Sequence, residues 1–523
     1  MTIEAGTAGG ERAHDKDFFG HPKGLQILFM TEMWERFSYY GMRALLIFYL
    51  TQHFLFGDDR AVLIYGAYTA LVYLTPVIGG LLADRYLGAR KAVTFGAILL
   101  VLGHIGMAVE GPLAEHVMGA GGEMGVERDP FFLNIFYLSL ALIITGVGFL
   151  KANISTIVGA LYEKNDARRD GGFTLFYMGI NLGAMLGALI AGWVGQTVGW
   201  WAGFGLAGFG MLFGLIQFQR GQKYLYGHAE PPDEAVLKEK IFAGLSREVM
   251  IYIGGFLGVV VIWQLIQHQE FIGQLLDVFG LLVLTAILVF AFRKCTKEER
   301  DRMLVATGLI ITSILFWALF EQAGSSLNLL ADRNVDRVVF GLEIPASTLQ
   351  SLNAFFIIAL APLFAIMWIK LSQKGREPST PVKFALGLML LGLGFLVLVF
   401  GMSQASDGIT PLIWLVLLYF LHTAGELCLS PVGLSMVTKL SVTRVVGMMM
   451  GVWFLASGYA NFVAGRIAQM TSGGAEGGEL AEGVNAADIY IDVYTNVGLL
   501  AVGAGLVLFL VSPLLRKGMH GVH

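Results

Sequence analysis

Fourteen long apolar segments follow one another along the chain, separated by loops rich in Gly, Pro, Asp, Lys and Arg. A helix needs about 20 mostly apolar residues to cross the hydrocarbon core of a membrane, whereas a transmembrane β-strand shows about 10 residues of alternating polarity. None of the segments alternates in that way. The sequence therefore predicts an all-α, polytopic membrane protein, with helices over residues 25–54, 61–83, 91–110, 131–160, 172–196, 200–219, 249–267, 274–292, 303–329, 350–370, 382–402, 411–437, 445–470 and 490–514.

Composition excludes a soluble fold. Apolar residues make up 56% of the 523 residues and charged residues only 14%, against about 25% in soluble proteins. A single soluble core stops growing near about 250–300 residues, so it could not bury this much apolar surface. The formal net charge of −4 argues against a nucleic-acid partner. Cys295 lies in a basic loop and Cys428 in an apolar segment, so no disulfide framework, metal site or cofactor is expected.

The distribution of Lys and Arg predicts the orientation of the helices, because cytoplasmic loops of membrane proteins carry an excess of these residues. With the N-terminus in the cytoplasm, external loops hold four of the 35 Lys and Arg residues and the spans hold another four. The other 27 lie on the cytoplasmic side. The external loop 471–488 has four acids and no base. An even number of spans then places both termini in the cytoplasm. The external bases are Arg60, Arg128, Arg333 and Arg337, and those within spans are Arg36, Arg43, Lys151 and Arg466.

The predicted spans fall into groups of six, two and six. We expect a cytoplasmic tail at 1–23, a first bundle at 24–219, a cytoplasmic linker at 220–248, two inserted helices at 249–293, a second bundle at 294–515 and a cytoplasmic tail at 516–523. The linker is expected to hold a short helix, and the inserted helices are apolar without buried charge. Two six-helix bundles around a midplane cavity are the layout of major facilitator transporters, but helix number alone does not predict transport.

The first predicted span carries a stripe of charged residues and tyrosines. A charge at bilayer depth costs about 2.5–3.5 kcal/mol on insertion scales, so such residues are retained mainly where they line a wet cavity or form pairs. Their spacing places all of them on one helix face, with Leu, Ile, Phe and Met opposite. The stripe should therefore face other helices or water, and a capping cluster at a helix end is the alternative. Its members are Glu32, Glu35, Arg36, Tyr39, Tyr40 and Arg43.

Single charges lie within three further spans, at Lys151, Glu321 and Glu426. With the four charges of the first span they sum to −1, so one bound proton would neutralise the set. A cavity with both signs of charge and aromatic walls suits a small zwitterion, since acidic groups would bind its ammonium and basic groups its carboxylate. For each residue alone, a structural ion pair or ordinary helix packing is the alternative. The accompanying polar and aromatic residues are Tyr73, Tyr177, Asn181, Trp317, Asn353, Ser430 and Trp453.

Motifs of other function classes are missing or misplaced. The sequence has no GxxxxGK[ST] motif, so ATP is not expected to drive the protein. The GxGxxG match at 203–208 lies within a predicted span and not after a strand, which indicates close helix packing rather than nucleotide binding. No HExxH or GxSxG motif supports an intramembrane enzyme, so a membrane-embedded enzyme or receptor is a remote alternative.

Residues 32–41, EMWERFSYYG, resemble the ExxERFxYYG signature of the proton-dependent oligopeptide transporter family. The resemblance extends over about residues 20–515, through VYLTPVIGGLLADRYLGARKA (72–92), FYMGINLGAMLGALIAGWV (176–194), FWALFEQAGSSLNLLADR and GELCLSPVGLSMV. The inserted pair of helices is typical of the bacterial members. The resemblance implies the major facilitator fold and a proton-coupled symporter that imports di- and tripeptides across the bacterial inner membrane. A symporter of another small anion or zwitterion, such as nitrate or an amino-acid conjugate, is the alternative.

The resemblance also implies how individual residues would bind a peptide. Arg36 and Lys151 would face the peptide carboxylate, and Glu426, Asn181 and Asn353 would take the peptide amine. The tyrosines and tryptophans would line side-chain pockets. The further residues expected to bind substrate are Tyr40, Arg43, Tyr73, Tyr177, Trp317, Ser430 and Trp453.

Proton coupling and gating are implied for the buried charges. Salt bridges of the kind Arg43–Glu321, as the external gate, and Lys151–Glu426, as the internal gate, would open and close in turn. Some relatives carry a second-helix His linked to proton transfer, but AVLIYGAYTALVY (61–73) has none, so a carboxylate must carry the proton, and His422 is expected to be a packed, neutral His. Nothing in the sequence marks an oligomeric state. The residues implied in proton coupling are Glu32, Glu35, Arg36, Glu321 and Glu426.

Overall fold

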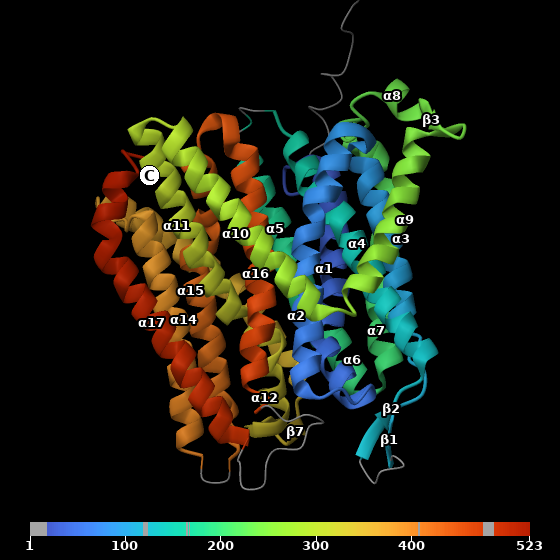
Figure 1. Ribbon diagram of the computed structural model, residues 1–523, viewed down its shortest axis with the longest axis vertical. Coiled ribbons are helices and arrows are strands. Elements are labelled where there is room, and N and C mark those ends of the chain that lie inside the picture. Colours follow the sequence, from blue (N-terminus) through green and yellow to red (C-terminus); the bar gives the residue numbers. More distant parts are fainter. Residues whose placement is uncertain are drawn as a thin grey trace, which may run out of the picture.

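The computed structural model describes residues 18–118, 124–163, 166, 168–405, 408–473 and 486–522. These residues form long helices that run side by side (Figure 1). Most of the expected tail 1–23 and most of the expected acidic loop 471–488 lie outside the described residues. Among the described residues, twelve helical segments are long and apolar enough to cross a membrane. That count joins two consecutive helices as Asp58–Met107 and does not include the first helix, which carries the polar stripe.

The first group of helices covers the first six predicted spans. It consists of α1 (Lys23–Phe48, continued by a π-helical turn Tyr49–His53), α2 (Asp58–Leu82), α3 (Gly88–Met107), α4 (Pro130–Ala160), α5 (Arg169–Leu186), α6 (Gly192–Thr197) and α7 (Trp200–Gly221). The predicted boundaries of these spans agree with the helices to within a few residues. Where a helix follows a loop, local capping fixes its start. For example, the Asp129 side chain accepts a hydrogen bond from the Phe131 amide at 2.8 Å at the start of α4.

The remaining helices cover the last eight predicted spans. They are α9 (Arg247–Leu265), α10 (Gln269–Lys294), α11 (Lys297–Phe320), α12 (Ser326–Asn334), α13 (Ser351–Gln373), α14 (Thr380–Ser403), α15 (Leu412–Leu440), α16 (Val446–Met470) and α17 (Ala486–Gly518). A capping box between Thr296 and Glu299 starts α11 directly after α10. The all-α membrane fold predicted from the sequence is confirmed.

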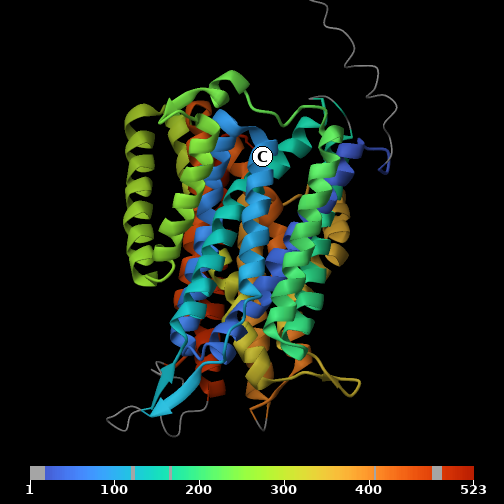
Figure 2. The ribbon, with the colours of Figure 1, turned by 90° about the vertical axis from the view of Figure 1, so that its right-hand side faces the viewer.

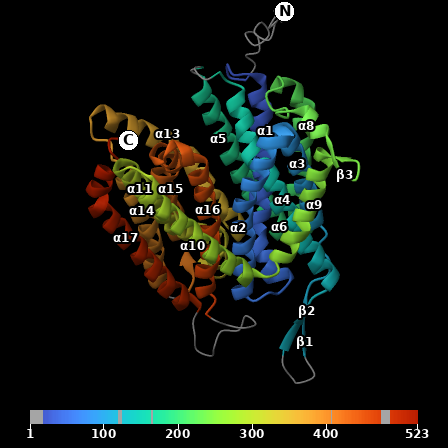
Figure 3. The same cartoon turned by 45° about the horizontal axis from the view of Figure 1, so that its top comes forward.

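The helices form two bundles, which Figures 1 and 3 show side by side. Helices α1 to α7 make the first bundle and α11 to α17 the second, while α9 packs on α4 and α10 packs on α11 and α16. The linker and the described C-terminal end lie on one face, at the top of Figure 2, which we call the linker face. The opposite face, which we call the far face, carries α12 and the hairpin of β1 and β2.

Glycines allow the closest helix contacts in both bundles. A Cβ on Gly96 of α3 would lie 2.5 Å from the Gly146 carbonyl oxygen of α4, and a Cβ on Gly392 of α14 would lie 2.6 Å from the Gly498 carbonyl oxygen of α17. Small residues at such crossings let helix backbones pack closely where lipid offers no hydrophobic driving force. Gly203, in the GxGxxG segment, packs in the same way against Gly195 and Leu45.

The ninth span differs from the single helix predicted over 303–329. Helix α11 ends at Phe320, a 3₁₀ turn covers Glu321–Gly324, and α12 begins at Ser326. Other helices compensate for the interrupted backbone: the Gln322 amide donates to the Ala464 carbonyl of α16 at 3.0 Å. Gly324 leaves room for the Tyr65 ring of α2, which a Cβ would overlap. Because these partners come from distant segments, the helical pattern of the sequence did not show the break.

Short strands in the loops add to the helical fold. Antiparallel pairs are β1 (Glu115–Met118) with β2 (Met124–Glu127), β3 (Lys240–Phe242) with β4 (Leu245–Ser246), and β6 (Val338–Val339) with β7 (Leu342–Glu343). Strand β5 (Val335–Asp336) runs parallel to β8 (Thr410–Pro411), with Val335 opposite Thr410. These pairs close loops and none lies within a bundle.

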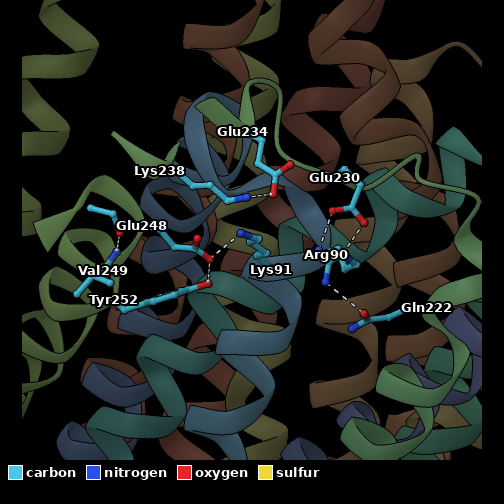
Figure 4. A network of polar contacts seen from close by, with 10 residues as sticks. Arg90, Lys91, Gln222, Glu230, Glu234, Lys238, Glu248, Val249 and Tyr252 are labelled. Carbon is cyan, nitrogen blue, oxygen red and sulfur yellow. Dashed lines mark hydrogen bonds and ion pairs between the residues drawn. The ribbon is translucent and has the colours of Figure 1, made fainter. Parts of the chain in front are cut away.

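The linker is fastened to the first bundle by ion pairs at the start of α3 (Figure 4). It contains the expected short helix, α8 (Glu234–Lys238). Arg90 contacts both carboxylate oxygens of Glu230, at 2.6 and 2.7 Å, and its backbone N–H donates to the Ala229 carbonyl. Lys91 Nζ lies 2.7 Å from Glu248 Oε1 near the start of α9. The start of α3 thus holds the linker at Glu230 and again at its end, Glu248.

Candidate functional site

A cavity of about 400 Å³ lies between the two bundles, within the size range of small-molecule sites. Helices α1, α2, α4 and α5 form one wall, and α11, α15 and α16, with Glu321 of the 3₁₀ turn, form the other. The cavity brings together residues that the sequence spreads over more than 400 positions. The predicted site residues that line it are Glu32, Arg36, Tyr73, Lys151, Trp317, Glu321, Ser430 and Trp453.

The polar stripe of α1 is buried between helices, as its spacing predicted. Arg36 Nε and Nη2 each lie 2.7 Å from Glu32 Oε1, one helical turn away, and Nε lies 3.2 Å from Glu35 Oε2. All three side chains are at most 8% exposed. The stripe is therefore not a capping cluster at a helix end, and one guanidinium lies between two carboxylates.

Lys151 of α4 reaches the cavity beside an aromatic ring. Its Nζ lies 3.9 Å from the centre of the Tyr73 ring of α2, a cation–π distance. Among the described residues, Lys151 forms no ion pair within 4 Å, with Glu426 or with any other acid. The predicted Lys151–Glu426 salt bridge is therefore absent from this conformation, and the ammonium faces the cavity.

Arg43 and Glu321 form the predicted salt bridge between the bundles, through Arg43 Nη2. Arg43 Nε also donates to the Tyr65 hydroxyl at 2.5 Å, and its guanidinium lies near the Tyr40 ring. Arg43 follows Arg36 by seven residues on α1, which is about 10 Å of helix toward the far face. Glu321 lies at the start of the 3₁₀ turn that interrupts the ninth span. The pair therefore lies on the far side of the cavity.

Additional contacts between the bundles lie beyond this pair, at the far face. Arg333 of α12 contacts both carboxylate oxygens of Asp58, at 2.5 and 2.9 Å. The Gln52 amide donates to Asp332 at 2.9 Å, and the Asn328 amide donates to the Ala44 carbonyl at 3.3 Å. From the sequence, Arg333 was expected only in an external loop. All three of these residue pairs involve α12, which exists because the ninth span is broken.

Glu426 of α15 is buried, and its partners are neutral. The Asn353 amide of α13 donates to Glu426 Oε2 at 3.0 Å and to the Thr423 hydroxyl at 3.1 Å. Glu426 and Asn353, both expected at the peptide amine, are therefore in direct contact. The cavity lining itself has Arg36 and Lys151, with Glu32 beside Arg36, on the wall of the first bundle and Glu321 on the wall of the second.

The sequence matches the POT family (PTR2) over residues 90–482. The chain belongs to this family. It is 38% identical over 496 residues to the peptide transporter YePEPT of Yersinia enterocolitica subsp. palearctica serotype O:3 (strain YE-P4), covering 89% of this chain and 90% of the relative. It is 35% identical over 531 residues to the di-/tripeptide transporter of Lactococcus lactis subsp. lactis (strain IL1403), covering 97% and 98%. The family predicted from the sequence motifs is confirmed.

The fold of the POT family is confirmed at the level of the whole chain. A crystal structure of the peptide transporter POT in complex with sulfate superposes with a TM-score of 0.80 at 35% sequence identity, covering 99% of this chain and 100% of that chain. This POT family chain is a multi-pass membrane transporter and not an enzyme. The GxGxxG segment lies within α7, as the interpretation of helix packing required.

Other predicted site residues of this POT family chain lie outside the cavity lining. Asn181 is buried, and its amide donates to the Tyr177 carbonyl of its own helix at 3.0 Å. The Tyr177 side chain is 44% exposed. The predicted residues outside the lining are Glu35, Tyr40, Arg43, Tyr177, Asn181, Asn353 and Glu426.

Several lining residues were not predicted. Ser155 follows Lys151 by one helical turn on α4, and Ser457 and Asn461 follow Trp453 by one and two turns on α16. The same spacing rule that defined the stripe of α1 could have found them. Ser and Asn are common in apolar helices without a functional role, so these three residues were not selected as site candidates. The remaining unpredicted lining residues are Pro76, Ala152, Phe176, Ile180 and Phe454.

His422 packs among aromatic rings. It is 2% exposed, and its ring centre lies 4.8 Å from that of Phe395. Within the described part of the chain, no group of three or more His, Cys, Asp or Glu side chains could hold a metal ion.

Proposed function

We propose that the protein imports di- and tripeptides together with protons by alternating access across the bacterial inner membrane, with both termini in the cytoplasm. The observation that carries the proposal is the separation of charge in the cavity. Arg36 and Lys151 line the wall of the first bundle, and Glu321 lines the wall of the second. Glu426 is buried in the second bundle outside the lining, where it accepts a hydrogen bond from Asn353. A peptide has one carboxylate and one ammonium group, which match these two walls.

Peptide binding assigns a role to each wall. The carboxylate binds Arg36 and Lys151, of which Lys151 has no competing acid within 4 Å among the described residues. The ammonium binds the Glu426 carboxylate, which Asn353 orients at 3.0 Å, and Asn181 of the first bundle is assigned to the same group. Tyr73, Trp317 and Trp453 offer apolar surfaces to side chains. The remaining residues assigned to substrate contacts are Tyr40, Arg43, Tyr177 and Ser430.

Alternating access uses the two salt bridges in turn. In the present conformation Arg43 and Glu321 hold the far side closed while Lys151 and Glu426 are apart. A proton on a gate carboxylate weakens the far pair and allows the far side to open. Lys151 and Glu426 then close the linker side until peptide competes for Lys151. Peptide and proton shift this equilibrium only as far as they bind the two states differently.

The proton-coupled carboxylates are Glu32, Glu35, Glu321 and Glu426. Glu32 and Glu35 lie next to Arg36, so protonation of either one changes the charge that a peptide carboxylate meets. This arrangement links proton binding to substrate binding through a single guanidinium, Arg36. Because the cavity lies between the bundles, each cycle can expose the same groups to either side.

The test is uptake of labelled dialanine into liposomes with an acid-outside pH gradient. Wild-type protein should accumulate the dipeptide, and unlabelled dipeptides should compete while single amino acids and nitrate should not. Glu35→Gln and Lys151→Ala should abolish accumulation, whereas Lys370→Ala, an exposed lysine at the end of α13, should not. Counterflow, which needs no gradient, should survive in a variant that loses only coupling. Accumulation by both variants at the wild-type level would refute the assignment.

A different small anion is the second candidate. A nitrate ion needs only the basic wall, whereas the structure also presents Glu321 to the cavity. Competition by nitrate without competition by dipeptides would favour that candidate over peptides.

A further inference from the structure

An apolar groove lies outside the two bundles' common cavity, between the second inserted helix and the second bundle. It encloses about 340 Å³ and is lined by residues 276–287 of α10, 307–314 of α11 and 452–459 of α16. Its polar lining side chains are Asp277, Thr307 and Tyr459. The groove lies at membrane depth on three apolar helices, so an acyl chain is the natural occupant of such a space.

Each of the three lining helices leads to basic residues at the linker face. Ile287, at the linker end of the groove, precedes Arg293 and Lys294 by six and seven residues on α10, which is about 10 Å of helix. Thr307 follows Lys297 by ten residues on α11, or about 15 Å. In a bilayer the polar headgroup layer borders the hydrocarbon core, so a lipid whose chain lies in the groove can place its headgroup about 10–15 Å away, at these bases. The groove therefore lies directly beneath a basic surface.

Three of these bases have no acidic partner nearby. Within this loop Arg302 pairs with Glu298 at 2.6 Å and Arg300 with Asp301 at 3.1 Å, while Glu299 lies 3.5 Å from Arg444. All three carboxylates of the loop thus have basic partners. Among the described residues, no acid lies within 4 Å of the remaining bases, which are exposed. These are Arg293, Lys294 and Lys297, which we call the basic triad.

Arg444 joins the third lining helix to the same surface. It lies directly before α16, and its Nη2 donates to the Lys294 carbonyl at 2.6 Å. Its guanidinium also lies 5.4 Å from the centre of the Phe290 ring of α10. The Arg444 side chain therefore links the start of α16 to the end of α10, where the triad lies, in addition to the connection through the chain.

The opposite end of the groove repels anions. Asp277 is the second residue of the lining segment of α10, and it accepts a hydrogen bond from the Tyr459 hydroxyl at 2.8 Å. Its carboxylate is exposed, in keeping with the expectation that the inserted helices carry no buried charge. A negative headgroup is disfavoured near Asp277 and favoured near the triad. The charge pattern thus favours one orientation of an anionic ligand, with its negative group at the linker end of the groove.

We propose that this groove binds one chain of an anionic phospholipid from the leaflet on the linker face, with its phosphate on the basic triad. Basic clusters between transmembrane helices are suited to anionic headgroups, and each Lys or Arg near such a surface strengthens the attraction by about fivefold. The lipid fills the space between α10 and the second bundle. The site is independent of the peptide cavity and of the proposed transport.

The first test measures lipid selectivity by native mass spectrometry of the full-length protein with equal amounts of phosphatidylglycerol and phosphatidylcholine of the same chains. The wild type should retain phosphatidylglycerol preferentially. Arg293→Gln/Lys294→Gln/Lys297→Gln should lower this preference by about 100-fold if the three bases act independently. The matched control, Lys370→Gln/Lys374→Gln/Arg376→Gln, removes three exposed bases beside α13, away from the groove, and should keep it. Equal losses, or equal retention, in the two triple variants would overturn the proposal.

The second test separates the groove from the charges. Gly280 of α10 lines the groove, and a Cβ there meets no atom within 4 Å, so Gly280→Phe adds a bulky side chain at the groove from an open backbone position. This variant should lose phosphatidylglycerol although its basic triad is intact. Gly503→Phe, at an equally open position on α17, should not. Unchanged retention by Gly280→Phe would mean that charge alone attracts the lipid, and it would overturn the site. Thermal unfolding of each variant checks that it is folded.

Discussion

The two walls of the cavity treat buried charge differently. On the wall of the first bundle, Arg36 lies within 3.2 Å of two carboxylates of its own helix, Glu32 and Glu35. On the wall of the second bundle, Glu426 is bound by the neutral amide of Asn353. Lys151 of the first bundle resembles Glu426 in this respect, because its ammonium group lies beside the aromatic ring of Tyr73 in place of an acid.

The difference indicates which charges stabilise the fold and which remain available for a ligand. A buried ion pair inside one helix is satisfied in every conformation of the bundles. A buried carboxylate with only neutral partners gains from a proton, a cation or the ammonium group of a substrate. We therefore expect Arg36 to matter for stability as well as for binding, and Glu426 and Lys151 to matter mainly for transport.

Substitution of Arg36 should have the largest effect on stability. Arg36→Gln leaves Glu32 and Glu35 buried without a cation, and loss of one partner of a buried pair costs about 3–5 kcal/mol. The measurement is the free energy of unfolding of the purified protein. Arg302→Gln is the control: it removes a half-buried arginine, 29% exposed and paired with the exposed Glu298 at 2.6 Å, and should cost about 1 kcal/mol or less. A small effect for Arg36→Gln would contradict the contrast between the walls.

Glu426→Gln should have a small effect on stability and a large effect on peptide binding. Gln has the same shape and still accepts a hydrogen bond from Asn353, so the free energy of unfolding should change by less than about 1 kcal/mol. Loss of the charge that binds the peptide ammonium should weaken binding by about 2 kcal/mol or more, or roughly 30-fold. Dipeptide binding and uptake measure this loss. A destabilised Glu426→Gln variant that still binds peptide would show that the carboxylate is structural.

Local sequence patterns were sufficient for most of the fold and for the face that α1 turns inward. The positions of the spans follow from apolar length, and Glu32 and Arg36 share a face because a helix repeats every 3.6 residues. Both are properties of one segment. Lys151, Glu321 and Glu426 stood out as single charges in apolar spans. Their spacing along the chain carries no information on their distances in space, so their roles in one site came from the family resemblance.

The missed features depend on contacts between segments. Helix α11 ends at Phe320 because Gln322 finds a carbonyl on α16 and Gly324 makes room for Tyr65 of α2. No pattern within 303–329 contains those partners. The pair of Arg333 and Asp58 is a consequence of the same break, since α12 brings Arg333 to the start of α2. Tertiary context of this kind needs the three-dimensional structure.

The Arg43–Glu321 pair should show a coupling between the bundles of intermediate size. In a double-mutant cycle with Arg43→Gln and Glu321→Gln, each single variant leaves a buried charge, while the double variant leaves none. The coupling energy in the free energy of unfolding should be about 1–3 kcal/mol. A parallel cycle of Arg43→Gln with Tyr65→Phe tests the hydrogen bond to the tyrosine and should give a smaller value. Additive effects of Arg43→Gln and Glu321→Gln would mean that the pair does not hold the bundles together.

The Arg333–Asp58 pair at the far face should have the smallest effect. Its side chains are 44% and 21% exposed, against 7% for both Arg43 and Glu321, so water screens it. Arg333→Gln should lower the free energy of unfolding by less than about 1 kcal/mol. At 1 M salt the screening length falls to about 3 Å, so this effect should vanish while the Arg43–Glu321 coupling remains. If both respond equally to salt, burial does not distinguish the two contacts, and the far face closes through surface charge rather than through the buried pair.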